Sequence, residues 1–344
     1  MKILFIDTES FPSHANFNRI HISALLNCGN TVDVAFKEGY SKILTEPNVK
    51  VVCEIPDKLY EHGKETRVFG RFLMLLRLWE VRRKVQFSDY DAIFLSYYDE
   101  TVLPFSFYPR GLFLINHINA DGLHHWLKRK LFLFLSARNT QIMISKRAYE
   151  YVRGLGVNNA RLVYHGLPNP YNKDVKRPEW MTHRYCVFSP SAMSSNMSFI
   201  QHLLDNRSFN EILISNDIQF VVKGNGVLVS HNPNVRIIDY FMEELEYQGC
   251  FVHSDVIFIS YLDDFKYRVS AVMLESIANK KNVLVRDTFG LREYEDIIGR
   301  TSYFSTIEEL TDVLVKAIKK KDIYYNDYLY KPKYNFIKKY DNQK

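Results

Sequence analysis

Two α/β domains, each built on a parallel sheet, are the fold that this sequence predicts. Short apolar runs alternate with helical stretches from end to end, and the runs are almost continuously apolar, as strands covered on both faces are. The segment HGLPNPYNKDVKRPEWMTH, with three prolines and no periodicity, separates two such series. A length of 344 residues lets each domain bury its own core.

The first series predicts an N-terminal domain over residues 1–170. The second predicts a C-terminal domain over 180–324, with the linker near 168–182. The tail 325–344 is basic and rich in tyrosine, and we expect either a final helix returning to the first domain or a frayed end. The predicted strands are KILFI, VDVAF, KVVCE, DAIFLSY, GLFLIN, QIMIS and RLVYH, starting at Lys2, Val32, Lys50, Asp91, Gly111, Gln141 and Arg161, then YCVFS, IQFVVKG, VRIID, DVIFIS and NVLVR, starting at Tyr185, Ile218, Val235, Asp255 and Asn282.

The composition indicates an ordinary globular protein in a reducing compartment. The net charge of +6 is too small to indicate a nucleic-acid partner. The four cysteines are scattered, which favours reduced thiols over a disulfide framework or a zinc site. The N-terminal MKILFIDTES predicts a first strand rather than a signal peptide, and no apolar run is long enough to span a membrane. We therefore expect a cytoplasmic protein.

Two parallel sheets joined by a short linker predict a cleft at the carboxyl ends of their strands, where ligands bind in such folds. The segment from Tyr267 to Gly290 is predicted to be a helix, a strand and a glycine turn at this edge. The helix is expected to begin near Arg268 to Ser270, so its first-turn amides would receive a diphosphate. About two turns later, Glu275 is expected to bind the two hydroxyls of a ribose, or else to face solvent on an ordinary helix.

The same stretch, YRVSAVMLES, KKNVLV and DTFGLREYED, resembles the donor-binding segment of the GT-B glycosyltransferases, closest to the family 4 enzymes with a Glu, seven residues and a second Glu. The resemblance covers roughly Tyr185 to Asp296. It implies two Rossmann-like domains facing across a cleft. It assigns the ribose to Glu275, the donor phosphates or sugar to the amides around Val269 and Ser270, and a close-approach turn to Gly290 and Leu291.

Tyr267 stands where that family places its first Glu, which contacts the transferred sugar. A tyrosine can hydrogen-bond and stack on a sugar face, but it carries no negative charge at neutral pH. Donor binding is therefore expected, while the retaining or inverting outcome stays open. Arg268, next to it, is expected either to neutralise the leaving diphosphate or to be a solvated arginine.

Small residues follow two other strands of the second series. In FSPSAMSSNMSF, Ser189 and Ser191 begin a loop whose amides are expected to approach the donor phosphates. The family often has a basic pair here, which this chain lacks. Lys223, with Gly224 in the Gly-Asn-Gly turn, is expected to supply the missing positive charge.

In the first series, FLINHINADGLHH places His117 just past a strand, where this architecture often has a residue facing the sugar. We expect His117 to bind the sugar or to deprotonate an acceptor hydroxyl, with Asp121, His124 and Asp99 as alternatives. Asn16 and Asn18, after the first strand, are expected to bind the acceptor. The histidines have no metal-ligand spacing, and we expect neither a metal nor a cofactor.

Two helical stretches, RVFGRFLMLLRLWEVRRKV from Arg67 and HHWLKRKLFLFLSAR from His124, are basic and apolar. Their apolar faces are expected in the core and their charges near an anionic membrane. Together with the resemblance, this predicts a peripheral glycosyltransferase that moves a sugar from a nucleotide-sugar to a lipid-linked or growing surface glycan, in capsule, O-antigen or exopolysaccharide synthesis. The alternatives are a nucleotide-sugar epimerase of the same architecture and a catalytically inactive nucleotide-sugar-binding scaffold protein.

Overall fold

The computed structural model describes residues 1–11, 14–43, 49–60, 67–191, 196–320, 325 and 330–337. The chain divides into two compact units. Unit 1 comprises Met1–Gly166, Tyr267–Val269 and Tyr330–Lys344, and unit 2 comprises Leu167–Lys266 and Ser270–Leu329. The short segment Tyr267–Val269 therefore belongs with the N-terminal part of the chain, although it lies within the sequence of unit 2.

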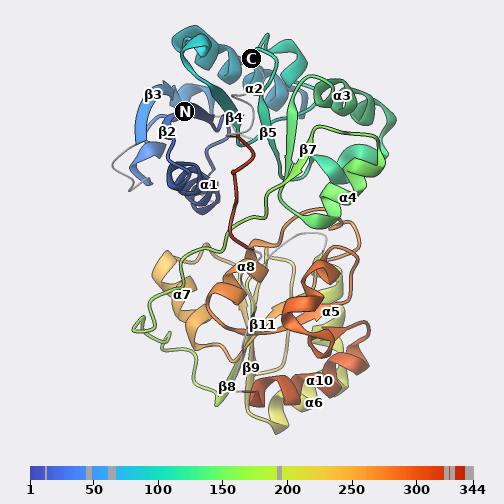
Figure 1. The fold of residues 1–344 in the computed structure, drawn as a ribbon. Helices are drawn as coiled ribbons and strands as arrows, with labels where there is room; N and C mark the ends of the chain where they lie inside the picture. The colour runs from blue at the N-terminus through green and yellow to red at the C-terminus, as the bar shows by residue number, and fades with distance from the viewer. Residues whose placement is uncertain are drawn as a thin grey trace. The chain divides into compact units, whose positions relative to one another are not determined.

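Unit 1 is built on a parallel sheet with the strand order β3-β2-β1-β4-β5-β6-β7 (Figure 1). The strand order changes direction between β1 and β4, because β2 and β3 lie on one side of β1 and all later strands lie on the other. The loops after β1, β4 and β5 therefore meet along one part of the carboxyl edge. The strands are β1 (Lys2–Ile6), β2 (Thr31–Lys37), β3 (Val49–Ile55), β4 (Ala92–Leu95), β5 (Phe113–Asn116), β6 (Thr140–Met143) and β7 (Ala160–Leu162).

Helices cover both faces of this sheet because alternate strand residues point to opposite sides. In β1, Leu4 and Ile6 join the core under α2, α3 and α4, whereas Ile3 and Phe5 join the core under α1. The helices are α1 (Ala15–Asn27), α2 (Arg67–Lys84), α3 (Trp126–Ser136) and α4 (Lys146–Gly154), and the 3-10 turns are η2 (Tyr40–Ile43), η3 (Asp57–Leu59), η4 (Phe87–Asp89), η5 (Leu103–Phe105) and η6 (Asn119–His124).

The end of the described chain packs into unit 1. Tyr334 and Ile337 are buried in the core under α1, and the Tyr334 hydroxyl lies 2.6 Å from Nδ1 of His21. In Figure 1 the red end of the chain runs beside α1. The core of unit 1 thus includes a hydrogen bond between two residues, His21 and Tyr334, that are 313 positions apart in the sequence.

Unit 2 is built on a second parallel sheet, with the order β10-β9-β8-β11-β12-β13. Its main core gathers apolar side chains of the sheet with those of α5, α6 and α10. The strands are β8 (Tyr185–Ser189), β9 (Ile218–Lys223), β10 (Val235–Ile238), β11 (Val256–Ile259), β12 (Asn282–Arg286) and β13 (Tyr303–Phe304). The helices are α5 (Met197–Asp205), α6 (Arg207–Ser215), α7 (Glu244–His253), α8 (Ala271–Ala278), α9 (Glu295–Ile298) and α10 (Ile307–Lys319), with the 3-10 turns η8 (Leu291–Tyr294) and η9 (Arg300–Ser302).

The predicted fold class is confirmed: both units are parallel α/β sheets flanked by helices. Each predicted strand forms, and the structure adds the two-residue strand β13. No strand or helix interrupts the described chain between β7 and β8, where the linker was placed. No helix in the described ranges combines the length and the apolar character that a membrane crossing requires.

Candidate functional site

The start of α8 is fixed by an N-cap. The Ser270 hydroxyl accepts a hydrogen bond from the Met273 backbone N–H at 3.1 Å, which satisfies one of the amides that a helix N-terminus leaves unpaired. The Ser270 backbone N–H donates to the Tyr294 hydroxyl at 3.0 Å, so this particular amide is already used within unit 2. The helix therefore starts at the predicted place, and the buried Ser270 is fixed through both its hydroxyl and its backbone N–H.

Glu275 lies on α8, half-buried, and receives the hydroxyls of two tyrosines. The Tyr247 hydroxyl from α7 donates to its Oε2 at 2.8 Å, and Tyr171 from the segment before β8 also hydrogen-bonds the carboxylate. Burial raises the pKa of Glu275, and the two tyrosine hydrogen bonds oppose that rise. The arrangement is a recessed acid that accepts hydrogen bonds from two hydroxyl groups.

Gly290 is a glycine because the preceding loop lies against it. A Cβ at this position would overlap the carbonyl oxygen of Phe265 and approach the Lys266 carbonyl oxygen to 3.1 Å. Leu291 is fully buried, and its carbonyl oxygen accepts a hydrogen bond from the Tyr303 hydroxyl at 2.7 Å. The predicted close-approach turn thus packs on the loop that leads into Tyr267.

The ends of β8 and β9 carry the other residues expected to bind the donor. Ser189 is buried at the end of β8, and Ser191 is half-buried and hydrogen-bonds Tyr261. Lys223 ends β9 with its Nζ 5.8 Å from the centre of the exposed Phe241 ring. Gly224 has no room for a side chain because a Cβ would overlap the Asp239 carboxylate.

Two buried oxygen atoms at this edge lack a hydrogen-bond partner within the described chain. They are Oδ1 of Asn196, at the start of α5, and Oγ1 of Thr288, just after β12. Buried polar atoms without partners are costly, since each loses its hydrogen bonds to water. Such atoms at the carboxyl edge of a parallel sheet are where a polar ligand would be bound.

Tyr267 and Arg268 are tied to η6 of unit 1. Asp121 accepts a hydrogen bond from the Tyr267 backbone N–H at 2.8 Å and forms an ion pair with the Arg268 guanidinium. The Tyr267 ring stacks on Tyr151, with the ring centres 4.3 Å apart and the planes 8° from parallel. The neighbouring Val269 packs, partly buried, against the core under α1. For Arg268 to neutralise a diphosphate, its guanidinium would have to be shared with Asp121 or released from it.

At the carboxyl edge of unit 1, Asp7 follows β1 and is fully buried. Its Oδ1 accepts the backbone N–H groups of Glu9 at 2.9 Å and Ser10 at 3.1 Å. Its Oδ2 accepts the Asn18 side-chain amide at 2.7 Å and lies 3.3 Å from Nδ1 of His14. Burial alone would raise the pKa of Asp7, but the hydrogen bonds from His14, Asn18 and the backbone outweigh it and lower the pKa. Asp7 is thus an ionised carboxylate held against an imidazole.

His117 lies beside this pair, stacked on His14 with ring centres 5.0 Å apart and planes 9° from parallel. It also contacts Phe17 at 4.0 Å between ring centres, and its Nε2 is buried without a partner in the described chain. Burial, together with the nearby His14, lowers the pKa of His117 to about 3. The imidazole is therefore neutral near pH 7 and takes up a proton only at a large cost.

The remaining predicted residues fall into different environments. Asn18 is fully buried, and its side-chain N–H groups donate to Asp7 and to the Tyr40 hydroxyl at 3.1 Å. Its Oδ1 accepts from the Ser96 hydroxyl at 2.6 Å, so Asn18 holds Asp7 in place. Asn16 is exposed on α1. The alternatives Asp99 and His124 are paired, the first with Arg71 and Thr101, the second through Nδ1 with the Asp121 carbonyl oxygen at 2.8 Å. Among the described residues, no His, Cys, Asp and Glu side chains are grouped as a metal site would need.

The structure adds Asp7, His14, Tyr171 and Tyr247 to the residues that the sequence singled out. An acid directly after the first strand, followed seven residues later by a histidine, was a usable signal for Asp7 and His14. The two tyrosines gave none, because they reach Glu275 from segments far from it in sequence.

The chain matches no protein-family model and no curated protein sequence. Its fold is nevertheless shared with solved structures. HepE of Anabaena in complex with UDP and glucose is 13% identical, covering 93% of this chain and 90% of that one, with a TM-score of 0.59. The lipopolysaccharide outer core galactosyltransferase WaaB, in its apo form, is 13% identical over 99% of this chain and 98% of that one, with a TM-score of 0.58.

A putative UDP-N-acetylglucosamine 2-epimerase of Listeria monocytogenes is 12% identical over 95% of this chain and 92% of that one, with a TM-score of 0.57. At these identities the comparisons show the fold and not the reaction. The chain therefore has the GT-B fold, with two Rossmann-like domains. Transferases and a putative epimerase both share this architecture, so its activity has to be argued from its own residues.

Proposed function

We propose that the chain is a glycosyltransferase that takes a sugar from a nucleotide-sugar bound by unit 2. The observation that carries the proposal is the Glu275 carboxylate, recessed on α8 five residues after the capped Ser270 and already coordinated by two hydroxyl groups. A ribose offers two vicinal hydroxyls in the same way, and a charged acceptor makes such hydrogen bonds strong. HepE, which shares the fold, is known in complex with UDP-glucose.

The diphosphate is proposed to lie along the carboxyl edge of the second sheet. The hydroxyls of Thr288, Ser189 and Ser191 can donate hydrogen bonds to phosphate oxygens there, and the buried Asn196 side-chain oxygen can accept one from a hydroxyl of the donor. The N-terminus of α8 supplies a positive dipole end for the leaving group. We propose that this dipole, with Lys223 and a shared Arg268, stabilises the leaving diphosphate without a metal ion.

Unit 1 is proposed to hold the acceptor and to remove its proton. His14 is better suited than His117, because Asp7 fixes its Nδ1 and leaves Nε2 as the nitrogen that accepts a proton. In the step we propose, the acceptor hydroxyl gives its proton to His14 Nε2 and its oxygen bonds to the anomeric carbon. The bond from that carbon to the diphosphate oxygen breaks, and the nucleoside diphosphate leaves with the electron pair.

The acceptor is proposed to be a lipid-linked or growing surface glycan, as in capsule, O-antigen or exopolysaccharide synthesis, with the enzyme peripheral to the cytoplasmic face of the membrane. WaaB, a lipopolysaccharide transferase, supports this acceptor class by shared fold. The exposed aromatic and basic side chains of α2 and α3 support the membrane location.

The test is a calorimetric titration with the nucleotides and nucleotide-sugars that raise the thermal unfolding temperature of the protein in a panel. Glu275→Gln removes the charge at constant size, and we expect the affinity for the best nucleotide to fall at least about tenfold, since hydrogen bonds to a charged group contribute ~1.5–3 kcal/mol. Glu246→Gln is the matched control, because Glu246 also accepts a tyrosine hydroxyl, that of Tyr240 at 2.6 Å, on the exposed side of α7. Unchanged affinity in Glu275→Gln would contradict the assignment.

Two other functions share the same donor site. The likeness to the putative Listeria epimerase favours a nucleotide-sugar epimerase as the first alternative. The ion pair of Arg268 with Asp121 and the stacked Tyr267 favour an inactive nucleotide-sugar-binding protein as the second. Conversion of the donor in the absence of any acceptor would identify the epimerase. Donor binding with no turnover, with or without surface-glycan acceptors, would identify the inactive protein.

A further inference from the structure

Unit 1 carries a second concentration of polar and aromatic side chains, at the edge opposite to His14 and His117. The segments 103–112 and 134–139 come together there, directly before β5 and β6, and therefore at the amino edge of the sheet. They enclose a pocket of about 70 Å³, roughly the volume of two water molecules. It is too small for a nucleotide or a sugar ring, which need several hundred Å³.

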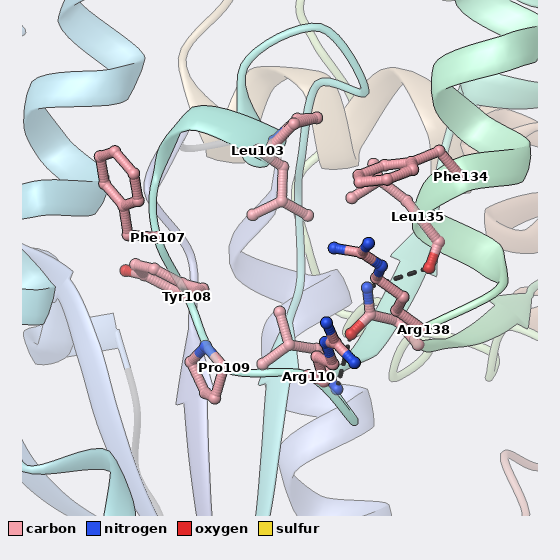
Figure 2. Close-up of a pocket in the computed structure, with 11 residues that line it drawn as sticks. Leu103, Phe107, Tyr108, Pro109, Arg110, Phe134, Leu135 and Arg138 are labelled. Atoms are coloured by element: carbon pink, nitrogen blue, oxygen red, sulfur yellow. Dashed lines mark hydrogen bonds between the residues drawn. The ribbon is translucent and has the colours of Figure 1, made fainter.

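Aromatic side chains stand at the rim of this pocket. Phe107 is 70% exposed and Phe134 is 45% exposed, and Figure 2 shows them on opposite sides of the pocket with the side chains of Arg110 and Arg138 between them. The rim continues onto α2, where the Trp79 indole N–H donates to the Phe105 carbonyl oxygen at 3.2 Å. Four exposed rings lie on these segments and on the neighbouring α2, and we call them the aromatic rim: Trp79, Phe105, Phe107 and Phe134.

The backbone holds Phe107 outward at a cost. Its φ is +57°, a left-handed conformation that bulky residues rarely adopt. The next residue, Tyr108, points inward, and its hydroxyl donates to the Leu78 carbonyl oxygen at 2.9 Å. The strained backbone therefore keeps the phenyl ring of Phe107 exposed to water, and such strain points to a function for the exposed ring.

Three arginines flank the rim. The Arg138 guanidinium lies 4.2 Å from the centre of the Phe134 ring, and the Arg82 guanidinium lies 5.9 Å from that of Phe107. Arg110 lines the pocket itself. Within the described chain none of the three forms an ion pair with a carboxylate, whereas nearby Arg83 is paired with Glu80 and Arg71 with Asp99.

We infer that the aromatic rim and Arg82, Arg110 and Arg138 form a docking surface for an anionic lipid bilayer. The rings would enter the level of the headgroups, where aromatic side chains are favoured, and the guanidinium groups would bind lipid phosphates. Arg110 and Arg138 both line the pocket, so a phosphate group at its mouth would meet two guanidinium groups. This inference rests on the membrane location in the proposed function but not on the transferase reaction, which needs the opposite edge of the sheet.

Vesicle sedimentation tests the surface. The protein is mixed with phosphatidylcholine vesicles or with vesicles rich in phosphatidylglycerol. We expect binding only to the second kind, weakened by salt. The double variant Arg110→Glu, Arg138→Glu should bind at least about 30-fold more weakly, because losing two basic residues at an anionic surface costs ~2 kcal/mol and the new negative charges add repulsion. The control Lys173→Glu, Arg207→Glu changes the same net charge on exposed positions of unit 2 and should bind like the unaltered protein.

A second variant separates docking from folding. Phe107→Asn removes the ring while asparagine tolerates the left-handed backbone, so the unfolding temperature should stay equal or rise as vesicle binding falls about tenfold. Phe241→Asn, at a 90% exposed ring of unit 2, is the matched control and should leave binding unchanged.

The inference is overturned if the unaltered protein binds neutral and anionic vesicles alike, or if the control variants lose as much binding as the rim variants. A parallel RNA-binding measurement gives a further contrary outcome. The inference is overturned if Phe107→Asn still binds anionic vesicles fully and the double arginine variant loses RNA binding but keeps vesicle binding, since the surface would then bind polyanions and not a membrane. The donor titration with Glu275→Gln is independent of all these outcomes, so a failure here leaves the transferase proposal standing.

Discussion

The carboxyl edges of the two sheets differ in the chemistry that they present. In unit 1 the edge carries the buried carboxylate Asp7 and the histidines His14, His117 and His165 packed around Phe17. In unit 2 the described edge carries small hydroxyl and amide groups and, on α8, the carboxylate Glu275. In the function that we propose, the first set removes a proton and the second binds hydroxyl and phosphate groups. One fold, used twice, thus carries a different side-chain chemistry in each unit.

The largest expected effect comes from His14. If unit 1 supplies the base and unit 2 only binds the donor, His14→Gln should lower the turnover number about 10²–10⁴-fold, as removal of a general base does. Turnover is measured as release of nucleoside diphosphate with the acceptor that the panel identifies, and nucleotide affinity is measured by calorimetry on the same protein. Affinity within twofold of the unaltered protein is expected. Weakened nucleotide binding together with full turnover in His14→Gln would contradict this division, since unit 1 would then bind the nucleotide and not supply the base.

Gly290 sharpens the description of unit 2. Because a Cβ would overlap the Phe265 carbonyl, Gly290→Ala should push the loop before Tyr267 aside and lower the free energy of unfolding by ~2–4 kcal/mol. Urea unfolding measures the loss. Gly154→Ala is the control with the opposite sign: nothing lies within 4 Å of a Cβ there, and alanine should stabilise α4 by ~0.5–1 kcal/mol. Equal effects of the two substitutions would show that the close packing at Gly290 is unimportant.

The smallest expected effect concerns pH and the histidines of unit 1. Burial lowers the pKa of His165 to about 4 and that of His117 to about 3, and it places the pKa of His21 well below 6.5. The unfolded chain takes up protons at these positions near pH 6.5 and the folded chain only at lower pH, so stability is full above pH 6.5 and is lost as the pH falls. Each such histidine contributes a slope of up to ~1.4 kcal/mol per pH unit.

Urea unfolding between pH 7 and pH 5 measures this slope, compared with that of His117→Phe. Glu9 and Glu275 have raised pKa values, mainly through burial, and oppose the trend as the pH approaches the acid range, so the difference between the two proteins is more informative than either slope. The variant should have a shallower slope by the contribution of one histidine. Parallel curves would show that the His117 imidazole is solvated.

The alternation of apolar strands with helices predicted the two sheets, since a strand buried on both faces has to be apolar along its whole length. The start of α8 was predicted well because capping is local: Ser270 and the Met273 amide are three residues apart. Of the proposed donor site, the sequence indicated Glu275 through its spacing from Tyr267. It could not indicate Tyr247, which is 28 residues away on another helix.

Other assignments depended on contacts that no spacing reveals. Asn18 was predicted at the acceptor side, and in the structure its side chain hydrogen-bonds Asp7, Tyr40 and Ser96, the last of them 78 residues away. Arg268 was expected near a diphosphate and pairs with Asp121, 147 residues away. An asparagine or an arginine after a strand looks the same in sequence whether its partner is a ligand or a distant side chain.

The sequence by itself determined the succession of strands and helices, the division into two series and the position of the capped helix that carries Glu275, because each follows from residues within one or two turns of each other. Only the tertiary structure decided that His14 rests on Asp7, that two tyrosines reach Glu275 and that Phe107 is held outward with the Arg82 guanidinium near its ring. Those arrangements arise where the sheet order brings distant loops to one edge, and burial and hydrogen bonding are fixed by that meeting and not by the local pattern.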